Sequence, residues 1–513
     1  MHGRLGIFAA SAVATLVALA APAQALDAQV ESFDGTHITT HFYPAAGLGE
    51  GDTAPTILIG HGWAGSGEAA SGSPAPFIAD GYNVVTWDAR GFGTSEGIVM
   101  IDHPKFEARD VSALIDFIAE QPEAQLDKPG DPRVGMSGGS YGGGIQFITA
   151  ARDKRVDVIT PTIPWHNLME ALYPRQAVKA GWDLALIGAG IPTATVPQGY
   201  FDPAGIPNQG GQSDHFYDSV ANGLATGAIP DAEIQWFDEH GPDFMLKKLD
   251  IPIMIAQGTV DTLFDLTQGH RNYQALKKNH IPLKMMWFCG GHGVCNVDSD
   301  SDSPALGDSA RVQERRLQWF DRYLKGNKST HTGPPFEWID QNGAWHKSPG
   351  GYPLKHAHHL KGSGGGTVPV TPGVTPLTGA LVLALPDPTA PIKVEIPAQG
   401  GEEIVGAPTL HFNYTATGAS TRLDGKAHIY GQIVDKERNV VVGNQATPIP
   451  IKFDGEEHKV RISLTRIANV ASPSGFELQL ISQSSLFDIQ RAAGAVTISD
   501  LEARLPITKP RKR

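Results

Sequence analysis

The chain has 513 residues, including 59 Gly, 38 Pro and two Cys, so it is long enough for two or three domains, each with its own hydrophobic core. Its 41 Lys and Arg face 54 Asp and Glu, giving a net charge of -13. This charge excludes nucleic acid and anionic membrane surfaces as main partners, because both would repel an acidic body.

The first 25 residues have the pattern of a secretory signal peptide. Arg4 precedes an apolar run from Leu5 to Ala21, and small residues on either side of Gln24 form a cleavage site. The run is short for a membrane span and no later apolar stretch is long enough, so no integral membrane span is expected in the mature form. We therefore expect a secreted, extracytoplasmic protein that folds where disulfides form.

Residues 26–361 alternate apolar strands with helical patterns, after an initial hairpin at Asp34-Gly35. Strands are predicted over 55–61, 82–88, 133–137, 156–163, 251–258 and 283–288, and helices over 106–121, 263–278 and 309–326. Strands that are apolar on both faces predict a parallel sheet covered by helices on both sides, which is an α/β fold. The interval 165–249 is too long for one crossover, so we expect an inserted cap there.

A change in composition divides the chain near residue 362. Residues 362–373 are rich in Gly, Pro and Ser and are predicted to be a linker. Residues 374–513 contain short alternating runs separated by turn residues, with little helical periodicity. This pattern predicts an all-β sandwich or jelly roll at the C-terminal end.

The strongest chemical motif is the glycine-flanked serine at 138–142, between a predicted strand and a helix. A nucleophile elbow is a sharp turn of this kind, which needs small neighbours and exposes the serine hydroxyl. Ser140 is therefore the candidate nucleophile. A second Gly-x-Ser-x-Gly register would select Ser137, but that residue falls inside the predicted strand.

A serine nucleophile needs an imidazole base, which a carboxylate in turn orients. In an elbow fold the acid and then the base follow the serine in chain order, each after a later strand. Asp261 and His292 occupy these positions, after the strands 251–258 and 283–288. Asp265 is the rival acid, and His166 and His240 in the predicted cap are weaker rival bases.

The oxyanion of a tetrahedral intermediate needs two preorganised donors. One is expected to be the backbone N–H of Tyr141, directly after the candidate nucleophile. The other is expected from the loop 59–67, where the N–H of Trp63 is the candidate. The alternative is that this loop is only a tight turn in which His61 is a structural residue. Asp88 and Arg90, in the loop after the next strand, are interpreted as fixing loop geometry.

The two cysteines, Cys289 and Cys295, flank the candidate base. In an exported protein they are expected to form a disulfide that restrains the His292 loop. A zinc site would need a fourth ligand and lacks the usual spacing, and the acidic run 298–308 lacks the glutamate of a calcium loop. We therefore expect no metal and no other cofactor.

Five segments together resemble the Xaa-Pro dipeptidyl-peptidase and cocaine-esterase-like hydrolases. They are GGSYGG (138–143), VVTWDARGFGTSEG (84–97), QGTVDTLF (257–264), WFDRYLKG (319–326) and NGAWHKSP (342–349). The resemblance implies an α/β-hydrolase fold with a helical cap insertion and a C-terminal jelly roll, acting through Ser140, Asp261 and His292. Members of that family often carry a tyrosine in the first oxyanion loop, where this chain has His61-Gly62-Trp63.

The favoured function is a secreted serine hydrolase that cleaves ester or amide bonds of small molecules. The alternative is an Xaa-Pro dipeptidyl-peptidase acting on short peptides, which would bind the substrate amine through carboxylates of the cap. A third reading, a binding protein that uses the jelly roll, predicts that Ser140→Ala leaves its activity intact. The cap offers carboxylates and aromatic residues that could serve a pocket or the core, and a homo-oligomer is left open; these residues are Asp202, Asp214, Asp218, Glu233, Asp238, Glu239, Trp165, Tyr173, Trp182, Tyr200, Phe201 and Trp236.

Overall fold

The computed structural model describes residues 25–68, 74–194, 211–295, 310–373, 379 and 384–508. The predicted signal peptide, apart from Ala25, and the acidic run 298–308 lie outside the described residues, as do Tyr200, Phe201 and Asp202. Within the described ranges, no helix combines the length and the apolar character needed to cross a membrane.

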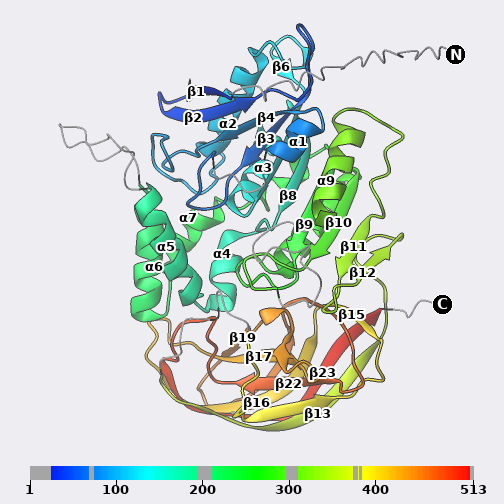
Figure 1. Cartoon of the computed structure of the whole chain (residues 1–513). Coiled ribbons are helices and arrows are strands. Elements are labelled where there is room, and N and C mark those ends of the chain that lie inside the picture. Colours follow the sequence, from blue (N-terminus) through cyan, green and yellow to red (C-terminus); the bar gives the residue numbers. More distant parts are fainter. Residues whose placement is uncertain are drawn as a thin grey trace, which may run out of the picture.

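The N-terminal part of the chain forms a ten-stranded sheet in the order β1-β2-β4-β3-β7-β8-β9-β10-β11-β12 (Figure 1). The strands are β1 (Leu26–Glu31), β2 (His37–Tyr43), β3 (Thr56–Gly60), β4 (Asn83–Trp87), β7 (Val134–Gly139), β8 (Val156–Thr162), β9 (Ile253–Gly258), β10 (Leu283–Phe288), β11 (Phe336–Ile339) and β12 (Trp345–Ser348). Strands β4 to β11 run parallel, whereas β1, β2 and β12 pair antiparallel. All six strands that were predicted from apolar runs are present. The runs are apolar because strands that are buried on both faces have few positions in contact with water.

Helices cover both faces of this sheet, each over a separate apolar cluster. The helices are α1 (Ala75–Ala79), α2 (Glu107–Ala119), α3 (Tyr141–Arg152), α8 (Leu266–Leu276), which continues into η3 (Lys277–Asn279), and α9 (Ala310–Tyr323). One cluster holds Phe77 of α1 and Phe320 of α9, and the other holds residues of α2, α3 and α8. A small hairpin of β5 (Leu126–Lys128) and β6 (Asp131–Pro132) stands apart.

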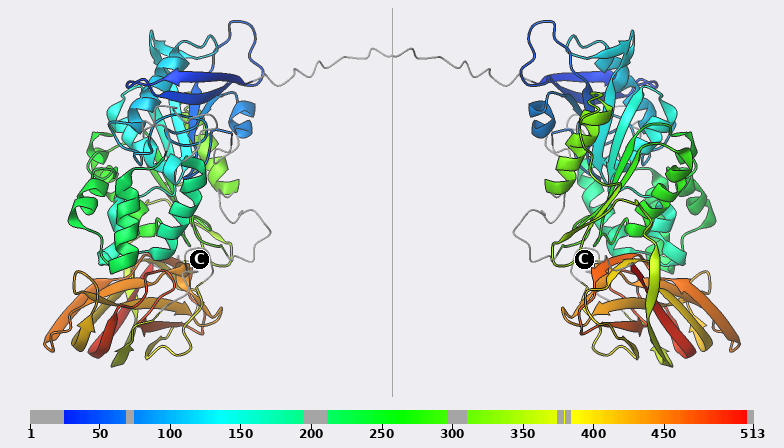
Figure 2. Two further views of the ribbon diagram at one scale, coloured as in Figure 1. Left: turned by 90° about the vertical axis from the view of Figure 1, so that its left-hand side faces the viewer. Right: turned by 90° about the vertical axis from the view of Figure 1, so that its right-hand side faces the viewer.

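The interval between β8 and β9 contains the predicted helical cap. It consists of α4 (Leu168–Leu172), η1 (Pro174–Gln176), α5 (Ala180–Ala194), α6 (Asp214–Thr226), α7 (Asp231–Asp238) and η2 (Leu246–Lys248). The helices α5, α6 and α7 lie along one side of the molecule (Figures 1 and 2). Trp165 and Tyr173 of the cap are buried in the hydrophobic core, so these two aromatic side chains contribute to core packing.

The C-terminal part consists of antiparallel sheets packed around a core of their own. Its elements are β13 (His356–Val370), β14 (Ile392–Ile396), β15 (Glu403–Gly406), β16 (Thr409–Ser420), β17 (Ala427–Asp435), β18 (Val440–Val441), η4 (Val442–Asn444), β19 (Thr447–Ile451), β20 (Glu457–Ser463), β21 (Ile467–Val470), β22 (Phe476–Ile481) and β23 (Ala492–Thr508). The prediction of a C-terminal jelly roll is confirmed, and this domain lies at one end of the molecule (Figure 2).

The predicted linker over 362–373 is wrong, because most of it is a strand. β13 pairs with β23 along nearly its whole length, with shifts in register between His356 and His358 and between Gly364 and Gly366. A Cβ on Gly362 would lie 2.3 Å from the carbonyl oxygen of Glu395, so glycine permits a close backbone approach at this position. The glycine-rich composition therefore reflects tight packing within the jelly roll, which begins near residue 356.

The cap and the jelly roll are joined by several hydrogen bonds. The Arg175 guanidinium of η1 donates to the carbonyl oxygens of Pro448 at 2.9 Å and Ser463 at 2.6 Å. In the opposite direction, the Leu423 N–H donates to the carbonyl of Thr226, at the end of α6. These bonds hold the C-terminal domain against η1 and the end of α6.

Candidate active site

Ser140 lies at the junction between β7 and α3, in a conformation that L-residues rarely adopt. Its φ of 56° and ψ of -117° turn the chain sharply from strand to helix. Close packing permits no side chain at position 142, since a Cβ on Gly142 would lie 2.1 Å from the carbonyl oxygen of Gly60. The strain and the small neighbours together place the Ser140 hydroxyl at the carboxyl end of the sheet.

The three residues predicted to cooperate form one hydrogen-bonded chain. The Oγ of Ser140 lies 2.7 Å from Nε2 of His292, and Nδ1 of the same ring lies 2.8 Å from Oδ2 of Asp261. With the ring proton on Nδ1 donated to the carboxylate, Nε2 is free to accept from the serine. The Asp261 side chain is fully buried, whereas 13 % of the His292 side chain is exposed.

Asp261 is held by the turn that follows β9. Its second carboxylate oxygen, Oδ1, accepts the backbone N–H groups of Leu263 at 2.9 Å and Phe264 at 2.7 Å. These bonds leave Oδ2 directed at the imidazole. Both oxygens of this buried carboxylate thus have hydrogen-bond partners.

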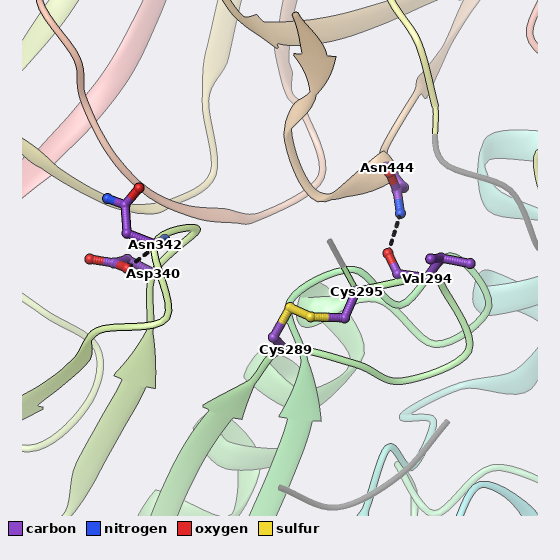
Figure 3. Close-up of a disulfide and its surroundings, with 6 residues drawn as sticks. All are labelled: Cys289, Val294, Cys295, Asp340, Asn342 and Asn444. Carbon is purple, nitrogen blue, oxygen red and sulfur yellow. Dashed lines mark hydrogen bonds between the residues drawn. A yellow bond between two sulfur atoms is a disulfide. The ribbon is translucent and has the colours of Figure 1, made fainter. Parts of the chain in front are cut away.

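The His292 loop follows β10 and is closed by a disulfide between Cys289 and Cys295 (Figure 3). The rings of Phe264 and Trp182 contact the imidazole edge-on, with centroids at 5.1 and 5.7 Å. Gly291 has a φ of +101°, and a Cβ there would lie 2.6 Å from Oδ2 of Asp261. The loop is thus fixed by a covalent closure, two aromatic contacts and a close approach to the acid.

Trp63 and Tyr141 carry the two backbone amides expected to bind the oxyanion. Their rings pack together, with centroids 5.6 Å apart. Across the described residues, neither amide has a hydrogen-bond acceptor. The Trp63 indole also donates to the carbonyl of Leu186 in α5 at 2.9 Å. His61 is structural, since its Nε2 accepts the Ala89 N–H and its Nδ1 donates to its own loop.

The rival candidates have other hydrogen-bond partners. Asp265 caps α8 by accepting the N–H of Thr267, and Ser137 is buried inside β7. His166 lies 2.9 Å from the side-chain oxygen of Asn272, and His240 is buried in the cap, where burial lowers its pKa to about 3. None of the four joins the Ser140 chain of hydrogen bonds.

A buried carboxylate group lies beneath Tyr141, and no sequence motif had indicated it. Glu107 and Asp102 have almost no exposure, and the Tyr141 hydroxyl lies 3.5 Å from Glu107 and 3.4 Å from the Asp102 N–H. Burial, with a contribution from the neighbouring Asp110, raises the pKa of Glu107 to about 7. Arg90 forms two hydrogen bonds of 2.6 Å with the Asp110 carboxylate and so neutralises part of the negative charge of the cluster. We interpret the cluster as a structural support for the elbow.

Sequence reasoning also missed two polar residues that hold the acid loop. Lys179 of the cap donates from Nζ to the carbonyl oxygens of Thr262 and Leu263 at 2.8 and 2.9 Å. Gln445 of the jelly roll donates to the carbonyl oxygen of Asp261 at 2.6 Å. Within the described ranges, no cluster of His, Cys, Asp and Glu could hold a metal ion.

The model of a family described as X-Pro dipeptidyl-peptidase (S15 family) matches residues 34–293. Among solved structures, an α-amino acid ester hydrolase aligns over 97 % of this chain and 100 % of its own, with a TM-score of 0.68 and 15 % identity. A CocE/NonD family hydrolase from Staphylococcus aureus aligns over 94 % of this chain and 93 % of its own, with a TM-score of 0.64 and 13 % identity. At identities this low, these similarities in structure show a common fold and nothing further.

Sequence relatives match a smaller part of the chain. An uncharacterized 31.7 kDa protein of Escherichia coli is 35 % identical over 106 residues, which is 20 % of this chain and 35 % of that protein. The chain thus spans about a third of that relative's length.

Proposed function

The chain belongs to the X-Pro dipeptidyl-peptidase family S15, and from this premise we propose that it is a serine hydrolase that cleaves carboxylic ester or amide bonds through Ser140. The observation that carries the proposal is the continuous chain of hydrogen bonds from Ser140 through His292 to Asp261. A serine is a weak nucleophile by itself, and this arrangement is the one that activates it.

The reaction is a two-step acyl transfer. His292 takes the Ser140 proton on Nε2 as Oγ attacks the substrate carbonyl, and the same proton then goes to the departing alcohol or amine. Water loses a proton to His292 in the second step, attacks the acyl-enzyme and releases the acid and free Ser140. Asp261 holds the imidazole through Nδ1 and stabilises its cation.

The N–H groups of Tyr141 and Trp63 are the proposed donors to the oxyanion of each tetrahedral intermediate. Tyr141 N–H is fixed at the first position of α3, and Trp63 N–H is fixed by the packing of its ring against Tyr141 and by its bond to α5. Donors held in advance lose little free energy to reorganisation when the negative charge forms.

The second candidate is release of Xaa-Pro dipeptides, which the description of the matching family favours. The two candidates differ in whether the substrate must carry a free amino terminus. The experiment compares a short-chain p-nitrophenyl ester with an Xaa-Pro p-nitroanilide, using the mature enzyme and its Ser140→Ala variant. Ester turnover that is lost in the variant supports the esterase, and anilide turnover that disappears when the amine is acylated supports the peptidase. Failure of Ser140→Ala to lower either rate would contradict the proposal.

We also propose that the protein is exported and acts outside the cytoplasm. The Cys289–Cys295 disulfide supports this location because such bonds persist in oxidising compartments. Amino-terminal sequencing of the protein recovered from the extracytoplasmic fraction should begin at Leu26. Recovery of the uncleaved chain in the cytoplasm would contradict the proposal.

A further inference from the structure

One turn of the jelly roll lies against both loops that carry the proposed acid and base. This turn consists of η4 (Val442–Asn444) and Gln445, and we call it the jelly-roll turn. Figure 3 shows its Asn444 side chain directed at the loop that the disulfide closes. The jelly-roll turn therefore contacts the site from a domain that supplies none of the proposed catalytic side chains.

Gln445 contacts the backbone of the acid residue itself. Its side-chain amide donates to the carbonyl oxygen of Asp261 at 2.6 Å and to that of Gly443 at 3.0 Å. Only 7 % of Gln445 is exposed, so little water reaches this amide. Leaving a buried carbonyl without a hydrogen-bond donor costs about 1–3 kcal/mol. The loop is therefore expected to shift toward another donor if Gln445 is replaced.

Asn444 contacts the base loop. Its side-chain nitrogen donates to the carbonyl oxygen of Val294 at 3.3 Å, two residues after His292. Its side-chain oxygen accepts the N–H of Ala384 at 3.2 Å, so the amide is fixed at both ends. A φ of 58° places Asn444 in the left-handed region, which asparagine tolerates better than most residues.

The cap also forms hydrogen bonds with the loop that carries Asp261. Lys179 is 3 % exposed and donates to the two carbonyls that follow Asp261, while the Trp182 indole donates to the Thr262 hydroxyl at 3.0 Å. Three consecutive carbonyl oxygens, those of residues 261–263, are thus bound by side chains from two other parts of the chain.

We propose that Gln445 is a positioning residue, through which the jelly roll sets the orientation of Asp261 toward His292. This inference rests on the proposed function of Ser140, His292 and Asp261. The reasoning is geometric, because Oδ2 meets the imidazole only while the backbone at Asp261 stays in place, and a misplacement of about 1 Å lowers a rate by about 10²-fold. Gln445 does not touch the reacting atoms.

The test compares Gln445→Met with the matched control Gln490→Met. Gln490 is also 7 % exposed and also donates to two carbonyl oxygens, those of His428 and Ser482, but within the jelly roll. We expect Gln445→Met to lower kcat by about 10²-fold with KM changed less than about threefold. The control should keep kcat within about threefold of the wild-type value.

Two further measurements make the result independent of the chosen substrate and of poor folding. The first is the rate at which an organophosphorus fluoride phosphonylates Ser140, a reaction in which the Oγ–P bond forms, fluoride leaves and His292 takes the proton. This rate should fall with kcat in Gln445→Met. The second measurement uses Gln445→Glu, whose side chain can donate a hydrogen bond only when it is protonated. The ratio of its kcat to the wild-type kcat should therefore increase as the pH is lowered from about 8 to about 5.

Equal losses in Gln445→Met and Gln490→Met, or a phosphonylation rate unchanged in Gln445→Met, would overturn the positioning role while leaving the proposed function in place. A flat ratio of Gln445→Glu to wild-type kcat across this pH range would also overturn it. If wild-type Ser140 is neither phosphonylated nor required for turnover, the proposed function fails, and the positioning role falls with it.

Discussion

The two halves of the candidate site are built in different ways. The nucleophile half, at Ser140, is made by residues close together in the sequence: a strand end, glycines and the first turn of α3. The acid and base half, at Asp261 and His292, is held by a disulfide and by side chains from the cap and the jelly roll. The first half is determined by local chain geometry, and the second depends on how three regions dock.

This difference indicates where each half is vulnerable. Changes near Ser140 act through steric overlap and affect folding and activity together. Changes around Asp261 can leave the fold intact and still misalign the acid. Four predictions test this contrast, beginning with the largest expected effect.

Asp261→Asn should lower kcat by about 10⁴-fold, because an amide cannot stabilise the imidazolium and favours the wrong tautomer. Steady-state kinetics and thermal unfolding should show this loss with little change in Tm, because the asparagine oxygen can still accept the N–H groups of Leu263 and Phe264. The matched control is Asp265→Asn, where asparagine remains a good helix cap and kcat should stay within about threefold. A similar loss in both variants would contradict the assignment of the acid.

Gly142→Ala should destabilise the protein by about 3 kcal/mol, since its Cβ would lie 2.1 Å from the Gly60 carbonyl oxygen. Denaturant unfolding measures the loss, and kcat should fall with it because the elbow must open. Gly188→Ala in α5 is the control, because a Cβ at this exposed position meets nothing within 4 Å. Alanine should stabilise that helix by up to about 1 kcal/mol. Equal effects at the two positions would refute the steric account of the elbow.

Replacing both Cys289 and Cys295 by serine should lower stability by about 2 kcal/mol, as expected for opening a short loop. The kcat should fall by about tenfold with KM little changed, because the His292 loop loses one of its restraints. Treatment of the wild-type protein with dithiothreitol should reproduce both effects. If the serine variant keeps full activity, the contacts with Phe264, Trp182 and Asn444 alone suffice to hold the base.

The smallest effect concerns an ion pair between the two domains. His346 of β12 lies between Asp340 at 2.8 Å and Glu403 of the jelly roll at 3.4 Å. Burial opposes its charge, but hydrogen bonds to the two carboxylates outweigh burial and raise its pKa to about 9. Because this pKa exceeds the unfolded value of about 6.5, the stabilisation is complete below about pH 6.5 and is lost as pH rises through about 9.

The measurement is the free energy of unfolding at about pH 6 and about pH 10, for the wild-type protein and His346→Gln. The difference between the two proteins should shrink by on the order of 1–2 kcal/mol at the higher pH, after allowance for partial exposure of the ring. A difference that stays constant with pH would show that His346 does not link the domains through its charge.

Much of the hydrolase fold follows from the sequence because its central strands are apolar on both faces and the predicted helices, now α2, α8 and α9, bury one face each. The elbow is visible for the same reason, since Gly-x-Ser-x-Gly between a strand and a helix is a local pattern. Strand order also placed Asp261 and His292 at one edge of the sheet, and the structure brings both to Ser140. Their catalytic roles remain proposals that the variants above test.

What the sequence did not reveal depends on contacts between distant segments. Lys179 and Gln445 stand in no motif, and an ordinary surface lysine or glutamine has the same appearance in a sequence. Their importance arises only when the cap and the jelly roll dock on the acid loop. The glycines of β13 were misread for a related reason, because composition cannot distinguish a flexible glycine from one that permits close packing.

The pairing of β13 with β23 also has a consequence for the order in which the protein is made. Among the described residues, the first strand of the jelly roll pairs only with β23, the last of the described strands, and β15 and β16 also pair with β23. During synthesis Ser140, Asp261 and His292 all leave the ribosome long before β23 does. A nascent chain therefore carries all three proposed catalytic residues while the domain that holds Gln445 against Asp261 still lacks its central strand.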